Sequence, residues 1–271
     1  MNYGSPHNAA PQAEFISVSL KDKIATITLC RSEVRNAIND KMRSELIDAF
    51  EWADSSNEVR AVILTGEGRG FCSGGDVSGM QERLNAPAGE IGFNGWRRQK
   101  RTHRSIAVVH GMTKPVIAAV NGAAVGLGLD LALACDFIIA VPRAKLSMSF
   151  IKRGLVSDGG GLYFLPRRVG LVRAKELILT GRIVEAEEGQ QIGLVDRIAP
   201  ADELLSAAHE WALELSHGSP AAIALTKAIL DRSLESTEEQ VFALGREAQA
   251  ICYSTSEHRA SVQAFLEKSQ S

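Results

Sequence analysis

Two short apolar runs, each followed at once by a glycine-rich loop, constrain the fold of this 271-residue chain. The run Ala61–Thr65 precedes the loop Gly66–Asp76, and Pro115–Val120 precedes the loop Asn121–Gly128. Apolar runs of this length are typical of strands that are buried on both faces. Each loop leads into a helical pattern. The alternation of strand and helix predicts an α/β fold with a largely parallel sheet and helices packed outside it.

The same alternation continues on both sides of these units. Phe15–Leu20 and Ile24–Leu29 predict a hairpin, and a helix capped by Asn39 or Asp40 should follow. After the first loop we expect a polar helical stretch to His110, and after the second a short helix and a strand FIIAV.

From Gly170 onward the sequence shows helical periodicity, and no further strand is expected. The helical runs are Arg173–Thr180, Ala201–Leu215, Pro220–Leu230 and Glu238–Ile251. We therefore divide the chain into a disordered tail (1–13), an α/β core (14–200) and a C-terminal helical region (201–271). The tail carries neither the basic nor the apolar segment of a signal peptide.

Composition and charge exclude several classes of protein. Hydrophobic residues make up 45% of the chain and charged residues 23%, which is ordinary for a globular protein. The formal net charge of -2 provides no field that would attract nucleic acid or an anionic membrane. Val116–Val141 is apolar enough to suggest a membrane span, but Asn121, Asp130 and Asp136 interrupt it, so we interpret it as buried core.

The four cysteines are scattered and lie outside any zinc-ligand spacing, so we expect neither a disulfide framework nor a metal site, and a cytoplasmic location. Gly70–Gly74 matches the cysteine form of a nucleophile elbow, with His209, His217 and His258 as potential bases. Several loop residues separate Cys72 from the preceding strand, whereas an elbow joins strand to helix directly.

The glycine loops themselves suggest different chemistry. Both leave the carboxyl ends of parallel strands, and backbone N–H groups freed at a helix start can converge there on one anionic oxygen. Such a pair of donors forms an oxyanion hole. The alternative is that the glycines only permit tight turns and close packing. Neither loop carries a nucleotide-binding motif.

Six segments make the sequence resemble the enoyl-CoA hydratase/isomerase (crotonase) superfamily over nearly its whole length. They are RSEVRNAIN (31–39), GFCSGGDV (70–77), KPVIAAVNGAAVGLGLDLALACDFIIA (114–140), LVSDGGGLYFLPRRVG (155–170), LTGRIVEAEEGQQIGLVDRI (179–198) and AFLEK (264–268). The resemblance implies a spiral of β-β-α units with a C-terminal helical trimerisation region, assembled as a homotrimer or a dimer of trimers. It also implies an acyl-CoA thioester substrate and no further cofactor.

The resemblance places the oxyanion hole on the backbone N–H groups of Gly75 and Leu127. Removal of the α-proton of a thioester generates an enolate, and two fixed N–H groups in a dry pocket would hold that charge more tightly than the neutral carbonyl. Leu127 departs from the glycine of the family's hydratases, although any residue offers the same amide.

The acid and base positions favour one reaction of the family. Its hydratases use two glutamates, and the corresponding residues here are Asp130 and Phe150. Phenylalanine cannot move a proton, which disfavours simple hydration. Asp158 stands where the family's isomerases, including the ring-epoxide isomerase of phenylacetyl-CoA breakdown, carry their catalytic aspartate. We therefore expect a shift of an enoyl double bond with Asp158 as proton shuttle, although Asp158 could instead cap the following helix.

Asp130 lies among leucines, so its carboxyl needs a partner, a proton or a place in the active site. We expect it to assist Asp158. His103 together with an aspartate at position 158 also matches the family's 4-chlorobenzoyl-CoA dehalogenase. The alternative for His103, as for the whole basic run Trp96–Arg104, is a solvated helix face.

Several residues match positions that bind coenzyme A or the acyl group in the family. They are Arg35, the carbonyl of Ala37, the loop residues Ser73, Asp76 and Val77, then Phe150 and Lys268. Two alternatives to an isomerase remain open from sequence alone besides dehalogenation: an enoyl-CoA hydratase, and a non-catalytic scaffold that binds acyl-CoA. We expect neither a nucleic-acid nor a membrane partner.

Overall fold

The computed structural model describes residues 9–78 and 85–269. Two segments with sequence predictions lie outside the described residues. The first is residues 1–8 of the predicted tail (1–13). The second is residues 79–84, which precede the polar helix predicted to end at His110.

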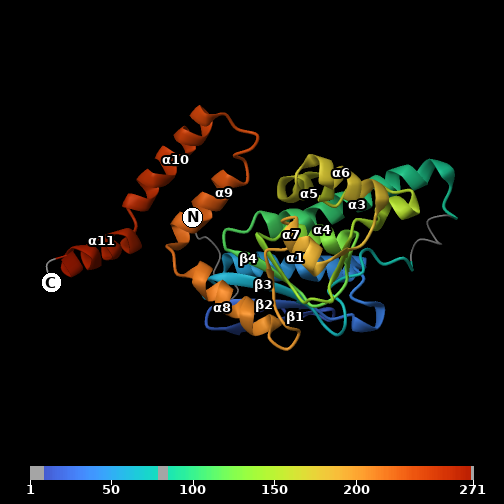
Figure 1. Ribbon diagram of the computed structural model, residues 1–271, viewed down its shortest axis with the longest axis horizontal. Coiled ribbons are helices and arrows are strands. Elements are labelled where there is room, and N and C mark those ends of the chain that lie inside the picture. The colour runs from blue at the N-terminus through green and yellow to red at the C-terminus, as the bar shows by residue number, and fades with distance from the viewer. Residues whose placement is uncertain (1–8, 79–84, 270–271) are drawn as a thin grey trace.

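A six-stranded sheet organises the body of the molecule (Figure 1). Its strands stand in the order β1 (Ile16–Lys21), β2 (Ile24–Leu29), β3 (Ala61–Gly66), β4 (Val116–Val120), β6 (Phe137–Ala140) and β9 (Arg197–Ile198). The β1–β2 pair is an antiparallel hairpin and all the other pairs are parallel. Every residue of β3 and β4 is buried, as the apolar runs predict. The predicted α/β class is confirmed.

The prediction that no strand follows Gly170 is wrong. The edge strand β9 pairs with β6, and β8 (Val184–Glu185) completes a second sheet with β5 (Ala124–Val125) and β7 (Lys145–Ser147). Both late strands are two residues long, too short for an alternating pattern to be visible. They form because each lies beside the unpaired edge of an existing strand, β8 beside β7 and β9 beside β6.

The helices surround these sheets. They are α1 (Asp40–Ser55), α3 (Ala88–His110), α4 (Leu127–Leu133), α5 (Gly161–Val169), α6 (Leu171–Thr180), α7 (Ala186–Gln191), α8 (Leu204–Ser216), α9 (Pro220–Leu230), α10 (Glu238–Tyr253) and α11 (Ser256–Ser269), with 3-10 turns η1 (Ser32–Val34) and η2 (Ser149–Arg153). Asn39 caps α1, since its side chain accepts a 2.8 Å hydrogen bond from the Met42 amide. The buried stretch Val116–Val141 is β4, β5, α4 and β6 of the core, and no helix among the described residues is long and apolar enough to span a bilayer.

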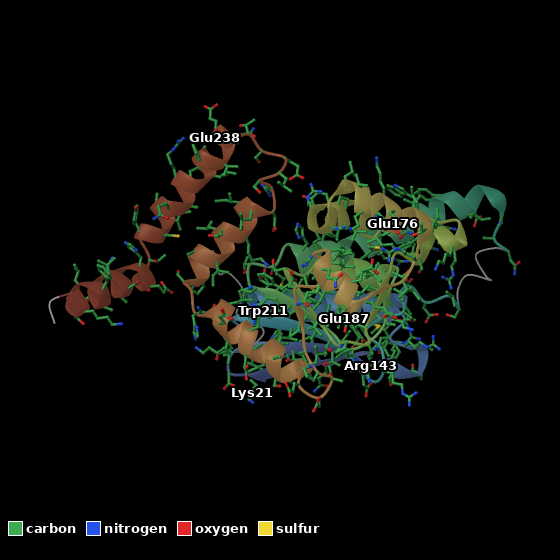
Figure 2. The ribbon with its side chains drawn as sticks, viewed as in Figure 1. Lys21, Arg143, Glu176, Glu187, Trp211 and Glu238 are labelled. Atoms are coloured by element: carbon green, nitrogen blue, oxygen red, sulfur yellow. The ribbon has the colours of Figure 1, made fainter. Side chains whose placement is uncertain are left out.

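The C-terminal helices divide into two groups. Helix α8 packs on the sheet, where the Trp211 ring lies 4.9 Å from that of Phe137, and α3 to α6 lie on the sheet's other side (Figures 1 and 2). Of the remaining C-terminal helices, α9 contacts the body through the ion pair of Lys227 with Asp136, whereas α10 and α11 project away from it; Glu238 marks the upper end of α10 in Figure 2. Large apolar side chains on α9 to α11 are exposed, among them Leu230, Phe242, Ile251, Tyr253 and Phe265.

The two glycine loops meet through their main chains. The Val125 amide donates a 2.9 Å hydrogen bond to the Cys72 carbonyl, and the Cys72 amide donates one of 3.0 Å to the Ala123 carbonyl. Gly128 is required for this approach, because a β-carbon there would lie 2.2 Å from the Cys72 carbonyl oxygen. The contact joins the loops that follow β3 and β4 into one unit.

We expect Gly128→Ala to lower the free energy of unfolding by about 3 kcal/mol, because the added methyl can be accommodated only by separating the two loops. Urea denaturation measures the change. Gly92→Ala on α3 is the matched control, since a β-carbon there meets nothing within 4 Å. The control should be neutral or stabilising by up to about 1 kcal/mol. Equal stability of both variants would contradict the loop contact.

Candidate active site

A cleft of about 420 Å³ brings together most of the residues that the sequence singles out. From the first glycine loop it is lined by Ser73, Gly75, Asp76 and Val77; from the second by Leu127; and beyond them by Phe150 and Asp158. The rest of its wall comes from α1, α3 and η2, including Asp40, Arg43, Arg98, Thr102 and Arg153. The cleft therefore lies at the carboxyl ends of β3 and β4, where parallel sheets commonly bind ligands.

Gly74 holds the two loops in contact at the cleft. Its φ of +103° suits glycine alone, and a β-carbon there would lie 2.9 Å from the Val125 carbonyl oxygen and 3.6 Å from the Leu127 nitrogen. Gly75 is the next residue along the chain. Gly75 and Leu127 are thus neighbours, although 52 positions separate them in the sequence.

The main-chain amides of Gly75 and Leu127 take no part in the hydrogen bonds of the neighbouring bridge and helix. Gly75 pairs with Ile38 in a short parallel bridge that uses the Gly74 carbonyl and the Asp76 amide. Because successive N–H groups in an extended strand point to opposite sides, the Gly75 amide faces away from that bridge. Leu127 begins α4, so its amide has no acceptor inside the helix. Both amides therefore lie outside the hydrogen bonds of the bridge and of the helix, on residues that line the same cleft.

Asp158 is the carboxylate that faces the cleft beside these amides. It does not cap the following helix, since α5 has Gly160 at its N-cap and no side-chain capping bond. Its side chain is 31% exposed, and its Oδ2 lies 3.6 Å from Nε2 of His103. His103 thus contacts the site through one ring nitrogen, although its side chain is 54% exposed on α3.

Asp130 lies behind Asp158 and does not line the cleft. The segment Gly159–Gly161 folds over its carboxyl so closely that a β-carbon at Gly159 or Gly161 would lie 2.4 or 2.6 Å from its oxygens. Among the described residues neither oxygen has a hydrogen-bond partner of ordinary geometry. Burial, reinforced by the charge of Asp158 and opposed by the Gly161 amide, raises the pKa of Asp130 to about 8.

The two other carboxylates in the cleft wall are held by arginines. Asp76 pairs with Arg31 at 2.9 Å, and hydrogen bonds from Ser78, together with this arginine, lower the pKa of Asp76 to about 2. Asp40 is bound by Arg43 and, at 3.1 Å, by Arg101. Asp158 differs from both, since among the described residues its ion-pair partner is a histidine and not an arginine.

Only some of the residues that are predicted to contact coenzyme A line the cleft. Arg35 is exposed, and its carbonyl accepts a 3.0 Å hydrogen bond from the Ser73 amide. The Ala37 carbonyl accepts a 2.5 Å hydrogen bond from Arg31, which was not singled out from sequence. Lys268 stands on α11, away from the cleft (Figure 1). Phe150 lies against Gly126 in the cleft wall.

The nucleophile-elbow interpretation of Cys72 is wrong. The thiol is completely buried, its Sγ donates to the Asn36 carbonyl at 3.0 Å, and burial raises its pKa to about 12. His209, one of the proposed bases, pairs instead with Asp22. In the described ranges, His, Cys, Asp and Glu side chains form no group of three that could hold a metal ion.

A second cavity, of about 580 Å³, lies between α9 and the body. Pro115 and Phe137 line it, which places it at the amino ends of β4 and β6. No residue predicted for the site lines this cavity. The cleft at the carboxyl ends is therefore the better candidate for chemistry.

Arg43 is a further cleft residue that sequence reasoning missed. It lies on the buried face of α1 with Leu46, Ile47 and Phe50, at the i+3, i+4 and i+7 positions. An arginine on an apolar helix face was the signal available in the sequence.

Comparison with known proteins gives a consistent family. The model of the enoyl-CoA hydratase/isomerase family matches residues 19–271. A 1,2-epoxyphenylacetyl-CoA isomerase of Escherichia coli is 33% identical over 94% of this chain and 96% of its own length. A probable enoyl-CoA hydratase of Rhodobacter capsulatus is 37% identical over 93% of this chain and 95% of its own.

Comparison with solved structures indicates the same family. A putative enoyl-CoA hydratase from Streptomyces coelicolor superposes with a TM-score of 0.89 at 32% identity, covering 99% of this chain and 97% of that one. An enoyl-CoA hydratase/isomerase from Cupriavidus metallidurans gives a TM-score of 0.88 at 35% identity and covers 95% of both chains. The predicted fold, a spiral of β-β-α units with a C-terminal helical region, is confirmed.

The raised pKa of Asp130 makes stability depend on pH. Unfolded, the carboxyl ionises near pH 3.8, whereas folded it retains its proton to about pH 8. Between these values the unfolded state binds fewer protons, so stability falls as pH rises. We expect Asp130→Asn to gain stability over the wild type across this interval, by up to a few kcal/mol, and the gain to level off above about pH 8.

Urea denaturation at a series of pH values measures this difference, with Asp48→Asn on the exposed face of α1 as the control. A difference between Asp130→Asn and the wild type that stays constant from pH 4 to 8 would show that Asp130 is already ionised in the folded protein.

Proposed function

The chain belongs to the enoyl-CoA hydratase/isomerase family, and from that premise we propose that it is an enoyl-CoA isomerase that moves a double bond along the acyl chain. One observation carries the proposal: Asp158, the cleft carboxylate that no arginine neutralises, lies in the same cleft as the amides of Gly75 and Leu127. The substrate is an acyl-CoA thioester, and the reaction requires no further cofactor.

In this mechanism the thioester oxygen accepts hydrogen bonds from the amides of Gly75 and Leu127. The Asp158 carboxylate removes a proton from C2 of a 3-enoyl thioester, and the negative charge spreads over the thioester oxygen and C4. Asp158 then returns the same proton to C4, which leaves the double bond between C2 and C3. The two amides act mainly on the dienolate, because its oxygen carries more charge than the starting carbonyl.

Asp130 supports this cycle from behind the cleft. With a pKa of about 8 it is protonated at neutral pH, so the pair of carboxyls carries one negative charge, on the member that faces the substrate. Asp130 itself has no access to the cleft and acts through Asp158. Phe150 adds to the cleft wall an apolar side chain that cannot exchange a proton.

Hydration of an enoyl-CoA is the alternative, favoured by the hydratase names among the relatives and by the two neighbouring carboxyls. It requires Asp158 to activate a water while a second group protonates the α-carbon. Asp130 is buried and Phe150 cannot move a proton, so hydration would need another group, such as His103, whose Nε2 lies 3.6 Å from Asp158 Oδ2.

We also propose that α9 to α11 assemble the chain into trimers, or dimers of trimers. The exposed apolar side chains on these helices support the proposal, because such surface is usually covered in solution. Light scattering should give a mass three or six times the 29.2 kDa of the chain. A monomer at micromolar concentration would contradict this assembly.

Asp158→Asn should lower the kcat for conversion of 3-hexenoyl-CoA to 2-hexenoyl-CoA by about 10²- to 10⁴-fold with little change in KM, because the amide cannot accept the proton. The absorbance of the conjugated thioester reports the reaction. Asp202→Asn, at an exposed turn before α8, is the control. Full isomerase activity in Asp158→Asn would refute the assigned role, and hydration of crotonyl-CoA that outpaces isomerisation in the wild type would favour the hydratase.

A further inference from the structure

Arg43 is a buried arginine whose guanidinium is only partly hydrogen-bonded within the described residues. Its side chain is 7% exposed, yet it lines the cleft. One of its terminal nitrogens binds Asp40, and its Nε is buried without a hydrogen-bond partner within the described residues. A guanidinium offers five N–H donors, and leaving one of them buried and unsatisfied is costly.

Several arginines surround Asp40 in the cleft wall. Arg43, Arg98 and Arg153 line the cleft, and Arg101 stands next to it. Asp40 is shared between Arg43 and Arg101, and its pKa is further lowered by the charge of Arg98. Asp40 is itself well exposed, with 61% of its side chain accessible, so solvent weakens its hold on Arg43.

The depth of Arg43 decides which part of a thioester it could meet. Val77, one of the residues matched to coenzyme A, is 53% exposed and lies near the opening of the cleft. Arg43 on α1 and Thr102 on α3 are instead buried, with no more than 6% of either whole residue exposed. A diphosphate would have to lose its water to reach them, whereas the far end of an acyl chain must enter a buried recess in any case.

We infer that the acyl group of the substrate ends in a carboxylate that Arg43 binds, so that the enzyme acts on the coenzyme A monothioester of a dicarboxylic acid. The inference rests on the proposed function and adds the substrate class. A guanidinium and a carboxylate form two parallel hydrogen bonds, which would satisfy donors that the fold leaves open. Asp40 competes with the substrate for the same guanidinium and keeps it oriented when the cleft is empty.

The test measures the dissociation constants of saturated thioesters, which bind without reacting. Adipoyl-CoA and hexanoyl-CoA differ only in a terminal carboxylate, and glutaryl-CoA with pentanoyl-CoA forms a second pair of another length. We expect the wild type to bind one dicarboxylic thioester about ten- to a hundredfold more tightly than its partner. Arg43→Met should reduce that ratio to about one, with hexanoyl-CoA affinity unchanged, and Arg43→Lys should keep part of it.

Two further variants complete the experiment. Arg104→Met, on the exposed face of α3 and paired with Glu51, removes an equivalent charge outside the cleft and should leave the ratio unchanged. Asp40→Asn removes the competitor and should raise the ratio, so it tests the inference even if Arg43→Met fails to fold. Tighter binding of the unsubstituted thioesters, or a preference that persists in Arg43→Met, would overturn the inference alone. Failure of every thioester to bind would overturn the proposed function with it.

Discussion

The main-chain contact between the two glycine loops determines everything else at the cleft. The hydrogen bond from Val125 to the Cys72 carbonyl, and the close approach that Gly128 allows, fix the distance between segments that follow different strands. Parallel pairing of β3 with β4 brings both loops to one edge of the sheet. Only then do the amides of Gly75 and Leu127 become neighbours. The parallel sheet brings the two loops to the same edge, and the glycines allow their main chains to come into contact.

The second constraint is electrostatic, and it separates two aspartates that the sequence makes look equivalent. The segment Gly159–Gly161, which follows Asp158, folds over the carboxyl of Asp130, so that Asp158 lines the cleft while Asp130 is enclosed. Enclosure keeps a proton on Asp130 at neutral pH, because a second negative charge so close to the first, without water, would be costly. The local chain path thus raises the pKa of Asp130 while it leaves Asp158 in the cleft wall.

Sequence reasoning predicted the features that depend on local pattern. The hairpin, the buried strands, the Asn39 cap and the run of C-terminal helices all follow from periodicity and capping chemistry. It missed β8 and β9, because two-residue strands depend on a neighbouring edge rather than on their own residues. It also missed that Asp130 lies behind the cleft, that Lys268 is held away from it and that Arg43 lines it. These are tertiary facts, set by how the Gly159–Gly161 segment, α11 and α1 pack.

The two candidate oxyanion donors belong to the main chain, which separates two kinds of evolutionary change. Substitution at position 127 alters the shape of the pocket but not the donor, as long as the loops keep their path. Proton transfer, in contrast, depends in the proposed mechanism on a side chain, the carboxylate at position 158. Ancestral duplicates of such a chain could exchange one reaction for another by altering a few acids, while the machinery that stabilises the shared anion was inherited intact.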